Sequence, residues 1–129
     1  IDVGGESTRP GYTLISDEEE ISRVVPVIEK IKENFDVPIS LDTYKTNVAR
    51  AGVEAGADMI NDVWGLKWKD RDMADLVAKS KAAVCIMHNK DNISYSNYVE
   101  DVLAELKESI DIAHKAGDLE KTMSRICLL

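Results

Sequence analysis

Short apolar runs alternate with segments of helical periodicity along this chain, and the alternation restricts the fold more than any other feature. Strands are predicted at residues 1–3, 37–41, 58–63 and 82–87, and helices at 17–35, 45–55, 70–81 and 96–116. Strands that are joined through helices by short connections lie parallel to one another. The sequence therefore predicts an α/β protein, either a doubly wound sheet or part of a (β/α)-barrel.

Residues at the predicted helix ends support these boundaries. Ser16 followed by Glu19 forms a capping-box pattern at the start of the first helix. Gly56 and Gly117 are typical of helix ends. Pro26 lies inside the first helix, so we expect either a kink there or a helix that begins near it. The last helix has an apolar stripe that is expected to face the core, formed by Val99, Val102, Leu103, Leu106, Ile110 and Ala113.

The chain is acidic, and its charge argues against several classes of partner. It has 129 residues, a formal net charge of −8 and an isoelectric point near 4.7. Nucleic acids and anionic membrane surfaces are bound through basic patches, so neither is expected as a partner. No apolar run approaches the roughly 18 residues of a membrane span and no signal peptide is visible, so we expect a cytoplasmic protein. Cys85, in an apolar run, is expected to be a buried thiol.

Residues 1–11 combine the end of a strand with a glycine-rich polar loop. Gly4 and Gly5 can adopt backbone angles that other residues avoid and can let a ligand approach closely. A carboxylate, two hydroxyls and a guanidinium follow, from Glu6, Ser7, Thr8 and Arg9, before a turn at Pro10 and Gly11. Arg9 with the two hydroxyls suits a diphosphate or an aryl carboxylate. This composition favours a ligand-binding loop, and the alternative is a solvated surface loop.

Polar side chains follow each of the four predicted strands. They are Asp2, then Asp42 and Thr43, then Asn61 and Asp62, then His88 and Asn89. Parallel strands bring their carboxyl ends to one edge, where ligand sites of α/β proteins lie, so these groups are expected to converge. The simpler alternatives are a helix N-cap for Asp42 and turn chemistry for Asn61 and Asp62. For His88 the alternative is a strand-end histidine that is satisfied by protein groups.

A carboxylate beside a carboxamide suits a flat heterocycle with adjacent donors and acceptors, such as an aminopyrimidinone. Asp42 can accept hydrogen bonds from ring N–H groups, and Asn61 can both accept and donate. The sequence has no P-loop, no dinucleotide fingerprint and no Ser-His-Asp or Cys-His pattern. Only His88 is plausibly placed as a metal ligand, so no protein-bound transition metal is expected. Mg²⁺ carried by a diphosphate is compatible with the sequence.

Four motifs stand in order along the chain. They are Gly4-Gly5-Glu6-Ser7-Thr8-Arg9-Pro10-Gly11, Ser40-Leu41-Asp42-Thr43-Tyr44-Lys45, Ile60-Asn61-Asp62-Val63 and Ile86-Met87-His88. In order and spacing they resemble dihydropteroate synthase over about residues 1–116. The resemblance implies a (β/α)₈ TIM barrel with outer helices, of which this chain would cover the second to fifth β/α units. It also implies a transferase of folate biosynthesis that joins 6-hydroxymethyl-7,8-dihydropterin diphosphate to 4-aminobenzoate and releases diphosphate and 7,8-dihydropteroate.

The resemblance further implies roles for individual residues. The pterin ring would be bound by Asp42 and Asn61, in a pocket lined by Val63 and Met87. The 4-aminobenzoate and the diphosphate would be enclosed by Ser7, Thr8, Arg9 and Pro10, with Thr8 and Arg9 taken as the catalytic pair. Mg²⁺ is expected with the diphosphate, and its protein ligand would lie outside this chain. The family usually forms homodimers.

The chain also departs from the family pattern. The family's first strand, with the loop whose Asn holds magnesium, has no counterpart here, and residues 122–129 do not match where a sixth strand should begin near residue 124. We therefore expect one pterin-binding barrel domain over residues 1–129, truncated at both ends and inactive or nearly so by itself. Two other interpretations are a related pterin-binding barrel, such as a methyltransferase acting on methyltetrahydrofolate, and a non-catalytic fragment that oligomerises through open strand edges.

Overall fold

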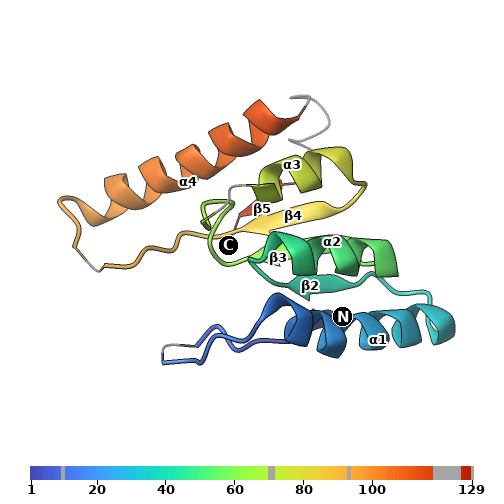
Figure 1. The fold of residues 1–129 in the computed structure, drawn as a ribbon. Coiled ribbons are helices and arrows are strands. Elements are labelled where there is room, and N and C mark those ends of the chain that lie inside the picture. Colours follow the sequence, from blue (N-terminus) through green and yellow to red (C-terminus); the bar gives the residue numbers. More distant parts are fainter. Residues whose placement is uncertain (10, 70–71, 93, 118–125, 129) are drawn as a thin grey trace.

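The computed structural model describes residues 1–9, 11–69, 72–92, 94–117 and 126–128, which form a parallel sheet with helices beside it (Figure 1). The strands are β1 (Asp2–Gly4), β2 (Ser40–Asp42), β3 (Met59–Asp62), β4 (Ala83–Ile86) and β5 (Ile126–Leu128). The helices are α1 (Asp17–Asn34), α2 (Thr46–Ala55), α3 (Asp72–Lys79) and α4 (Tyr98–Ala116). In the described part of the chain, no helix has the length and apolar character needed to span a membrane.

The strands follow one another across the sheet in chain order, and every neighbouring pair is parallel. A doubly wound sheet reverses its strand order at a switch point, whereas a (β/α)-barrel places each strand beside the previous one. The helices also pack in chain order, α1 on α2, α2 on α3 and α3 on α4 (Figure 1). The described residues therefore have the winding of a partial (β/α)-barrel, and the doubly wound alternative is excluded.

The core lies between the sheet and the helices and follows from the two-residue alternation of the strands. Leu41, Ile60 and Val84 are neighbours in the sheet register and are 0% exposed. The helices contribute apolar residues to the same cluster, among them Val24, Ile28, Val48, Met73 and Val77. The alternate strand residues point to the opposite face, and among them Asp42 and Asn61 are half-buried.

Most of the predicted helix ends are confirmed. Ser16 is the N-cap of α1, and its hydroxyl accepts a hydrogen bond from the N–H of Glu19 (3.2 Å). Gly56 ends α2 with a φ of 111°, which favours glycine. Helix α1 runs without interruption through Pro26, so the expectation of a start near the proline is wrong. Cys85 is buried, as predicted.

The C-terminal part differs from expectation in two places. Val99 and Leu103 are 61% and 60% exposed, although the apolar stripe predicted both to face the core. Buried residues of α4 occur only in its second half, at Ser109 and Ala113, and Figure 1 shows its first turns lying beyond the end of the sheet. Strand β5 pairs with β4 close to where the family's next strand was expected to begin, although residues 122–129 were judged not to match that strand. Periodicity indicates which face of a helix is apolar, but not whether another element covers that face.

Candidate functional site

Asp42 and Asn61 lie opposite each other at the carboxyl ends of β2 and β3. The N–H of Thr43 donates to the backbone oxygen of Asn61 (3.2 Å), which holds the two strand ends side by side. Residues in register on parallel strands point to the same face, so both side chains are presented on the face opposite the helices. The structure thus brings together the two residues that were predicted to bind a flat heterocycle.

Asp42 is half-buried, and one of its carboxyl oxygens is fully buried. Its Oδ1 atom has no hydrogen-bond partner among the described residues. Burial, together with the negative charges of Asp2, Glu20 and Asp62, raises the pKa of Asp42 to about 6. A carboxylate in this state lowers the stability of the fold but can accept hydrogen bonds from a ligand, and such groups often mark functional sites.

The two glycines before the polar loop have different structural roles. Gly4 is in register with Asp42, and a Cβ atom at Gly4 would lie 3.4 Å from the Cβ atom of Asp42, so its missing side chain leaves room beside the carboxylate. A Cβ atom at Gly5 would lie 2.9 Å from side-chain atoms of both Glu20 and Val24, so glycine lets the chain pack closely on α1. Neither glycine has a positive φ. The positive φ that glycine permits is therefore used at neither position, and close approach explains both glycines.

Of the two simpler roles considered for the strand-end residues, a helix cap and a turn, the structure excludes one and confirms the other. Asp42 is not a helix cap, because Lys45 occupies the N-cap position of α2. Asp62 is fully buried and accepts hydrogen bonds from the N–H groups of Trp64 (2.9 Å) and Leu66 (2.8 Å). The N-cap alternative is therefore wrong for Asp42, and the turn alternative is confirmed for Asp62.

The remaining strand-end residues lie at the same edge of the sheet. Val63 and Met87 directly follow β3 and β4, and both are half-buried. The Nε2 atom of His88 lies 3.0 Å from a carboxylate oxygen of Glu105 in α4. Nε2 nevertheless has no hydrogen-bond partner among the described residues, so the simpler alternative of a satisfied histidine is not confirmed.

The predicted substrate loop connects β1 to α1. Ser7 and Arg9 are exposed, Thr8 is half-buried, and Pro10 lies outside the described residues. The Ser7 hydroxyl accepts a hydrogen bond from the N–H of Arg9 (3.4 Å), a local contact within the loop. Within the described structure, neither the Thr8 hydroxyl nor the Arg9 guanidinium bonds to another side chain. These polar groups are not joined to Asp42, and they are available to a ligand.

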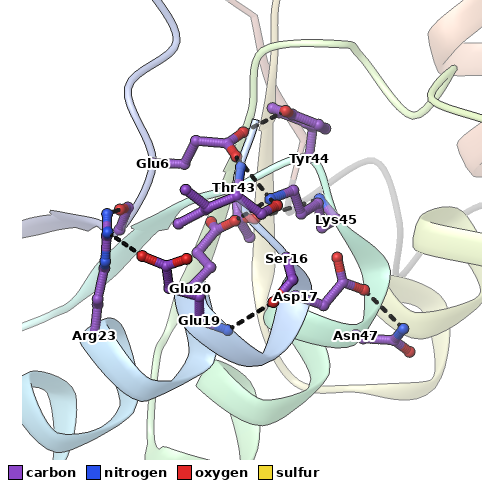
Figure 2. Close-up of polar contacts among 12 residues, drawn as sticks. Glu6, Ser16, Asp17, Glu19, Glu20, Arg23, Thr43, Tyr44, Lys45 and Asn47 are labelled. Atoms are coloured by element: carbon purple, nitrogen blue, oxygen red, sulfur yellow. Dashed lines mark hydrogen bonds and ion pairs between the residues drawn. The ribbon is translucent and has the colours of Figure 1, made fainter. Parts of the chain in front are cut away.

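Glu6 does not belong with the exposed polar groups of the loop, contrary to the expectation from the sequence. Glu6 is 9% exposed, and Figure 2 shows its carboxylate turned toward Tyr44 and Lys45. The Tyr44 O–H donates to Oε1, while the Lys45 ammonium (2.8 Å) and the N–H of Ile15 (2.7 Å) donate to Oε2. Burial opposes ionisation, but these hydrogen bonds hold the pKa of Glu6 below its ordinary value.

A second carboxylate completes this buried cluster. Glu20 of α1 is fully buried, and its Oε2 atom lies 2.8 Å from the Lys45 ammonium. Burial disfavours the charge on Lys45, yet the two carboxylates raise the pKa of Lys45 above its ordinary value. The sequence contains one signal for this arrangement. Glu20 precedes Val24 and Ile28 at helical spacing, so it falls on the apolar face of α1, where a carboxylate requires a partner.

Comparison with known proteins identifies the family. Residues 1–122 match the family model described as pterin binding enzyme. A dihydropteroate synthase of Clostridium beijerinckii is 62% identical over 117 residues, which cover 91% of this chain and 43% of that protein. The chain thus spans less than half the length of this relative.

Solved structures agree with this result. The dihydropteroate synthase from Clostridium difficile, determined in the presence of pteroic acid, superposes with a TM-score of 0.93 at 46% identity, over 99% of this chain and 48% of that chain. The dihydropteroate synthase of Xanthomonas albilineans with 4-aminobenzoic acid gives a TM-score of 0.86 at 42% identity, over 98% of this chain and 45% of that chain.

A sheet wound in chain order, with polar side chains at the carboxyl ends of its strands, defines a partial (β/α)-barrel of the kind that binds small molecules at that edge. The match to the family model and the similar solved structures identify the family within this class. The chain belongs to the pterin-binding enzyme family, and the relatives described above are dihydropteroate synthases.

Proposed function

We propose that this chain forms part of the active site of a dihydropteroate synthase. The reaction joins 6-hydroxymethyl-7,8-dihydropterin diphosphate to 4-aminobenzoate and releases diphosphate and 7,8-dihydropteroate. The observation that carries the proposal is the half-buried Asp42 carboxyl group, which lies beside Asn61 with one oxygen unpartnered. Because the chain spans about half the length of its relatives, the proposal concerns the reaction of the intact encoded protein.

The pterin ring is assigned to the strand ends. The Asp42 carboxylate would accept hydrogen bonds from ring N–H groups, and the Asn61 amide would both donate and accept. Gly4 leaves room beside this pair, and the half-buried Val63 and Met87 would supply apolar walls. The relative solved with pteroic acid supports a ligand of this class.

The second substrate and the leaving group are assigned to the loop after β1. The Arg9 guanidinium suits carboxylate or diphosphate oxygens, and Ser7 and Thr8 can add hydrogen bonds from the same loop as Pro10. In the proposed step the C–O bond to diphosphate breaks, and its electron pair leaves with the diphosphate. The arylamine nitrogen then attacks the cationic pterin methylene and loses a proton. Thr8 and Arg9 would stabilise the separated charges as the loop closes and excludes water.

Mg²⁺, a homodimer and a cytoplasmic location complete the proposal. The described residues include no group of three or more His, Cys, Asp or Glu side chains that is placed to hold a metal ion. No step above therefore depends on a metal held by these residues, and the ion would accompany the diphosphate. The dimer and the location rest on the resemblance to the family.

Ordered binding tests the proposal. Calorimetry on the intact encoded protein should detect 4-aminobenzoate or a sulfonamide only after a pterin ligand and diphosphate are present. Binding of methyltetrahydrofolate without any binding of aryl ligands would contradict the proposal and favour a methyltransferase. Large assemblies in light scattering without any ligand binding would favour the oligomerising interpretation. The 129 residues assayed by themselves are expected to give no turnover.

A further inference from the structure

One side chain holds both ends of the loop that carries Thr8 and Arg9. Glu6 lies at the start of the loop, directly after β1 and Gly5. Ile15 stands at the end of the loop, and its N–H donates to Oε2 of Glu6 (2.7 Å). The Glu6 carboxylate therefore closes the base of the loop across nine residues of sequence separation.

The same two ends are tied to the turn between β2 and α2. The Lys45 ammonium donates to Oε2 of Glu6 and to the carbonyl oxygen of Ile15, each at 2.8 Å. The Tyr44 hydroxyl donates to Oε1 of Glu6 and lies 3.3 Å from the hydroxyl of Tyr12. Figure 2 shows Tyr44 and Lys45 on one side of the Glu6 carboxylate. Two consecutive turn residues thus hold the whole base of the loop.

This turn is itself fixed by the core. Tyr44 is buried, and its ring packs edge-on against the ring of Trp68 with 4.6 Å between centroids. The Lys45 ammonium is also held by Glu20 of α1. The tip of the loop is exposed in contrast, at Ser7, Arg9, Gly11, Thr13 and Leu14. A fixed base and an exposed tip restrict the loop to few conformations, while its polar groups stay accessible.

We propose that Glu6 is a positioning residue that fixes the loop of residues 7–14 to the β2–α2 turn, and so sets where the loop meets 4-aminobenzoate. The inference rests on the proposed function, because it assumes that this loop binds that substrate. A loop whose ends are already held loses less conformational entropy when it closes. Loss of Glu6 therefore weakens the capture of 4-aminobenzoate more than that of the pterin substrate.

The contacts require a carboxylate at position 6. Both oxygens of Glu6 accept hydrogen bonds, from Tyr44 on one side and from Ile15 and Lys45 on the other. A glutamine that turns its NH₂ group toward the Tyr44 hydroxyl, which can accept, loses the charge that pairs with Lys45. In the other orientation it turns the NH₂ group toward the donors Ile15 and Lys45, so the clamp is weakened in either case. Glu20 is the matched control. It contacts Lys45 at the same 2.8 Å, but it belongs to α1 and, within the described residues, forms no hydrogen bond with residues 7–14.

Steady-state kinetics of the intact encoded protein compare Glu6→Gln with Glu20→Gln. In Glu6→Gln the KM for 4-aminobenzoate should rise about tenfold, while the KM for the pterin diphosphate should change by less than about threefold. In Glu20→Gln the melting temperature should fall, with the KM for 4-aminobenzoate within about twofold of the wild type. Hydrogen exchange at the Ile15 amide gives a readout that needs no activity. Protection should fall in Glu6→Gln and be kept in Glu20→Gln.

Equal changes of both KM values and of the melting temperature in the two variants would mean a purely structural cluster and overturn the inference. If Glu6→Gln does not fold, Tyr44→Phe tests the same point, because it removes the hydrogen bonds of the Tyr44 hydroxyl to Glu6 and Tyr12 and keeps both ion pairs. Its KM for 4-aminobenzoate should rise about threefold, and an unchanged value would overturn the inference. A wild-type protein without turnover would overturn the proposed function instead, and exchange at Ile15 would still decide whether Glu6 anchors the loop.

Discussion

The ammonium of Lys45 lies 2.8 Å from the carboxylate of Glu6, and the two side chains are 9% and 3% exposed. Glu20 approaches the same ammonium at 2.8 Å. One buried cation thus pairs with two carboxylates, one from the loop after β1 and one from α1. An ion pair of this kind is worth little against an apolar replacement of the whole cluster, but the removal of one partner leaves a buried charge uncompensated.

Lys45→Met should therefore destabilise the protein strongly. The expected loss in the free energy of unfolding is about 3–5 kcal/mol at neutral pH, because two buried carboxylates lose their counterion. Urea unfolding measures it. Lys30→Met is the matched control, since the side chains of Lys30 and its partner Glu33 are 75% and 64% exposed. Its effect should stay within about 0.5 kcal/mol, and equal losses in the two variants would contradict the assigned role of the cluster.

Asp42 should make the ligand-free protein less stable at neutral pH. Its pKa is raised from an ordinary value of 3.8 to about 6, so the folded state binds this proton more tightly than the unfolded state. The resulting stabilisation is complete below a pH of about 4 and is lost as the pH rises through about 6. Asp42→Asn should thus raise the free energy of unfolding at pH 8 by on the order of 2 kcal/mol, with little change at pH 4.

Asp58 supplies a control of opposite sign for this pH dependence. A hydrogen bond from Lys32 and another from the N–H of Ile39 hold the pKa of Asp58 below its ordinary value, against a smaller effect of burial. Its stabilisation is present at neutral pH and is lost as the pH falls through the lowered pKa. Asp58→Asn should therefore lower stability at pH 8, and the difference should shrink in acid. If Asp42→Asn and Asp58→Asn changed the free energy of unfolding at pH 8 in the same direction, the opposite pKa shifts of the two carboxyl groups would be contradicted.

Two substitutions should separate the two substrates. Asp42→Ala should weaken the binding of a pterin ligand by about 1–3 kcal/mol, the usual range for loss of a hydrogen bond to a charged group. Thr8→Ala should mainly affect 4-aminobenzoate. Since the pterin N–H groups bind the ionised Asp42, pterin affinity in the wild type should also rise as the pH passes about 6. Calorimetry measures all three effects, and an unchanged pterin affinity in Asp42→Ala would remove Asp42 from the site.

The alternation of strands and helices and the edge with the polar side chains could be predicted from the residue pattern, whereas the choice between a doubly wound sheet and a barrel came only from the family resemblance. Helical and strand periodicities are local, and parallel strands necessarily bring Asp42 and Asn61 to one edge. The buried cluster could not be predicted in the same way, because Glu6 and Lys45 meet only after the strands have paired. A glutamate in a polar loop is typical of a ligand-binding group. Only the burial of the Glu6 carboxylate shows that its hydrogen bonds go to other protein residues.

The C-terminal half of the chain shows a second limit. The apolar residues Val99 and Leu103 were placed on the correct helix, yet both are exposed. A stripe at helical spacing records that a helix is amphipathic, whereas burial depends on a neighbour that the stripe does not specify. The pairing of β5 with β4 also depends on a neighbouring element, because a strand of three residues forms only where the edge of β4 is available to pair with it.

Adjacent glycines at the end of β1 should respond differently to alanine. In Gly5→Ala the new methyl group would lie 2.9 Å from atoms of Glu20 and Val24, so α1 or the loop must move, and a loss of about 1–3 kcal/mol in the free energy of unfolding is expected. In Gly4→Ala the closest atom is the Cβ of Asp42 at 3.4 Å, an ordinary contact, so stability should change by less than about 1 kcal/mol.

The methyl group of Gly4→Ala would nevertheless fill the space beside the Asp42 carboxylate, and pterin affinity should fall by about tenfold. Urea unfolding and calorimetry on both variants measure the two effects. Full pterin affinity in Gly4→Ala would place the ring elsewhere, and a Gly5→Ala variant as stable as the wild type would mean that the packing of the loop on α1 is not tight.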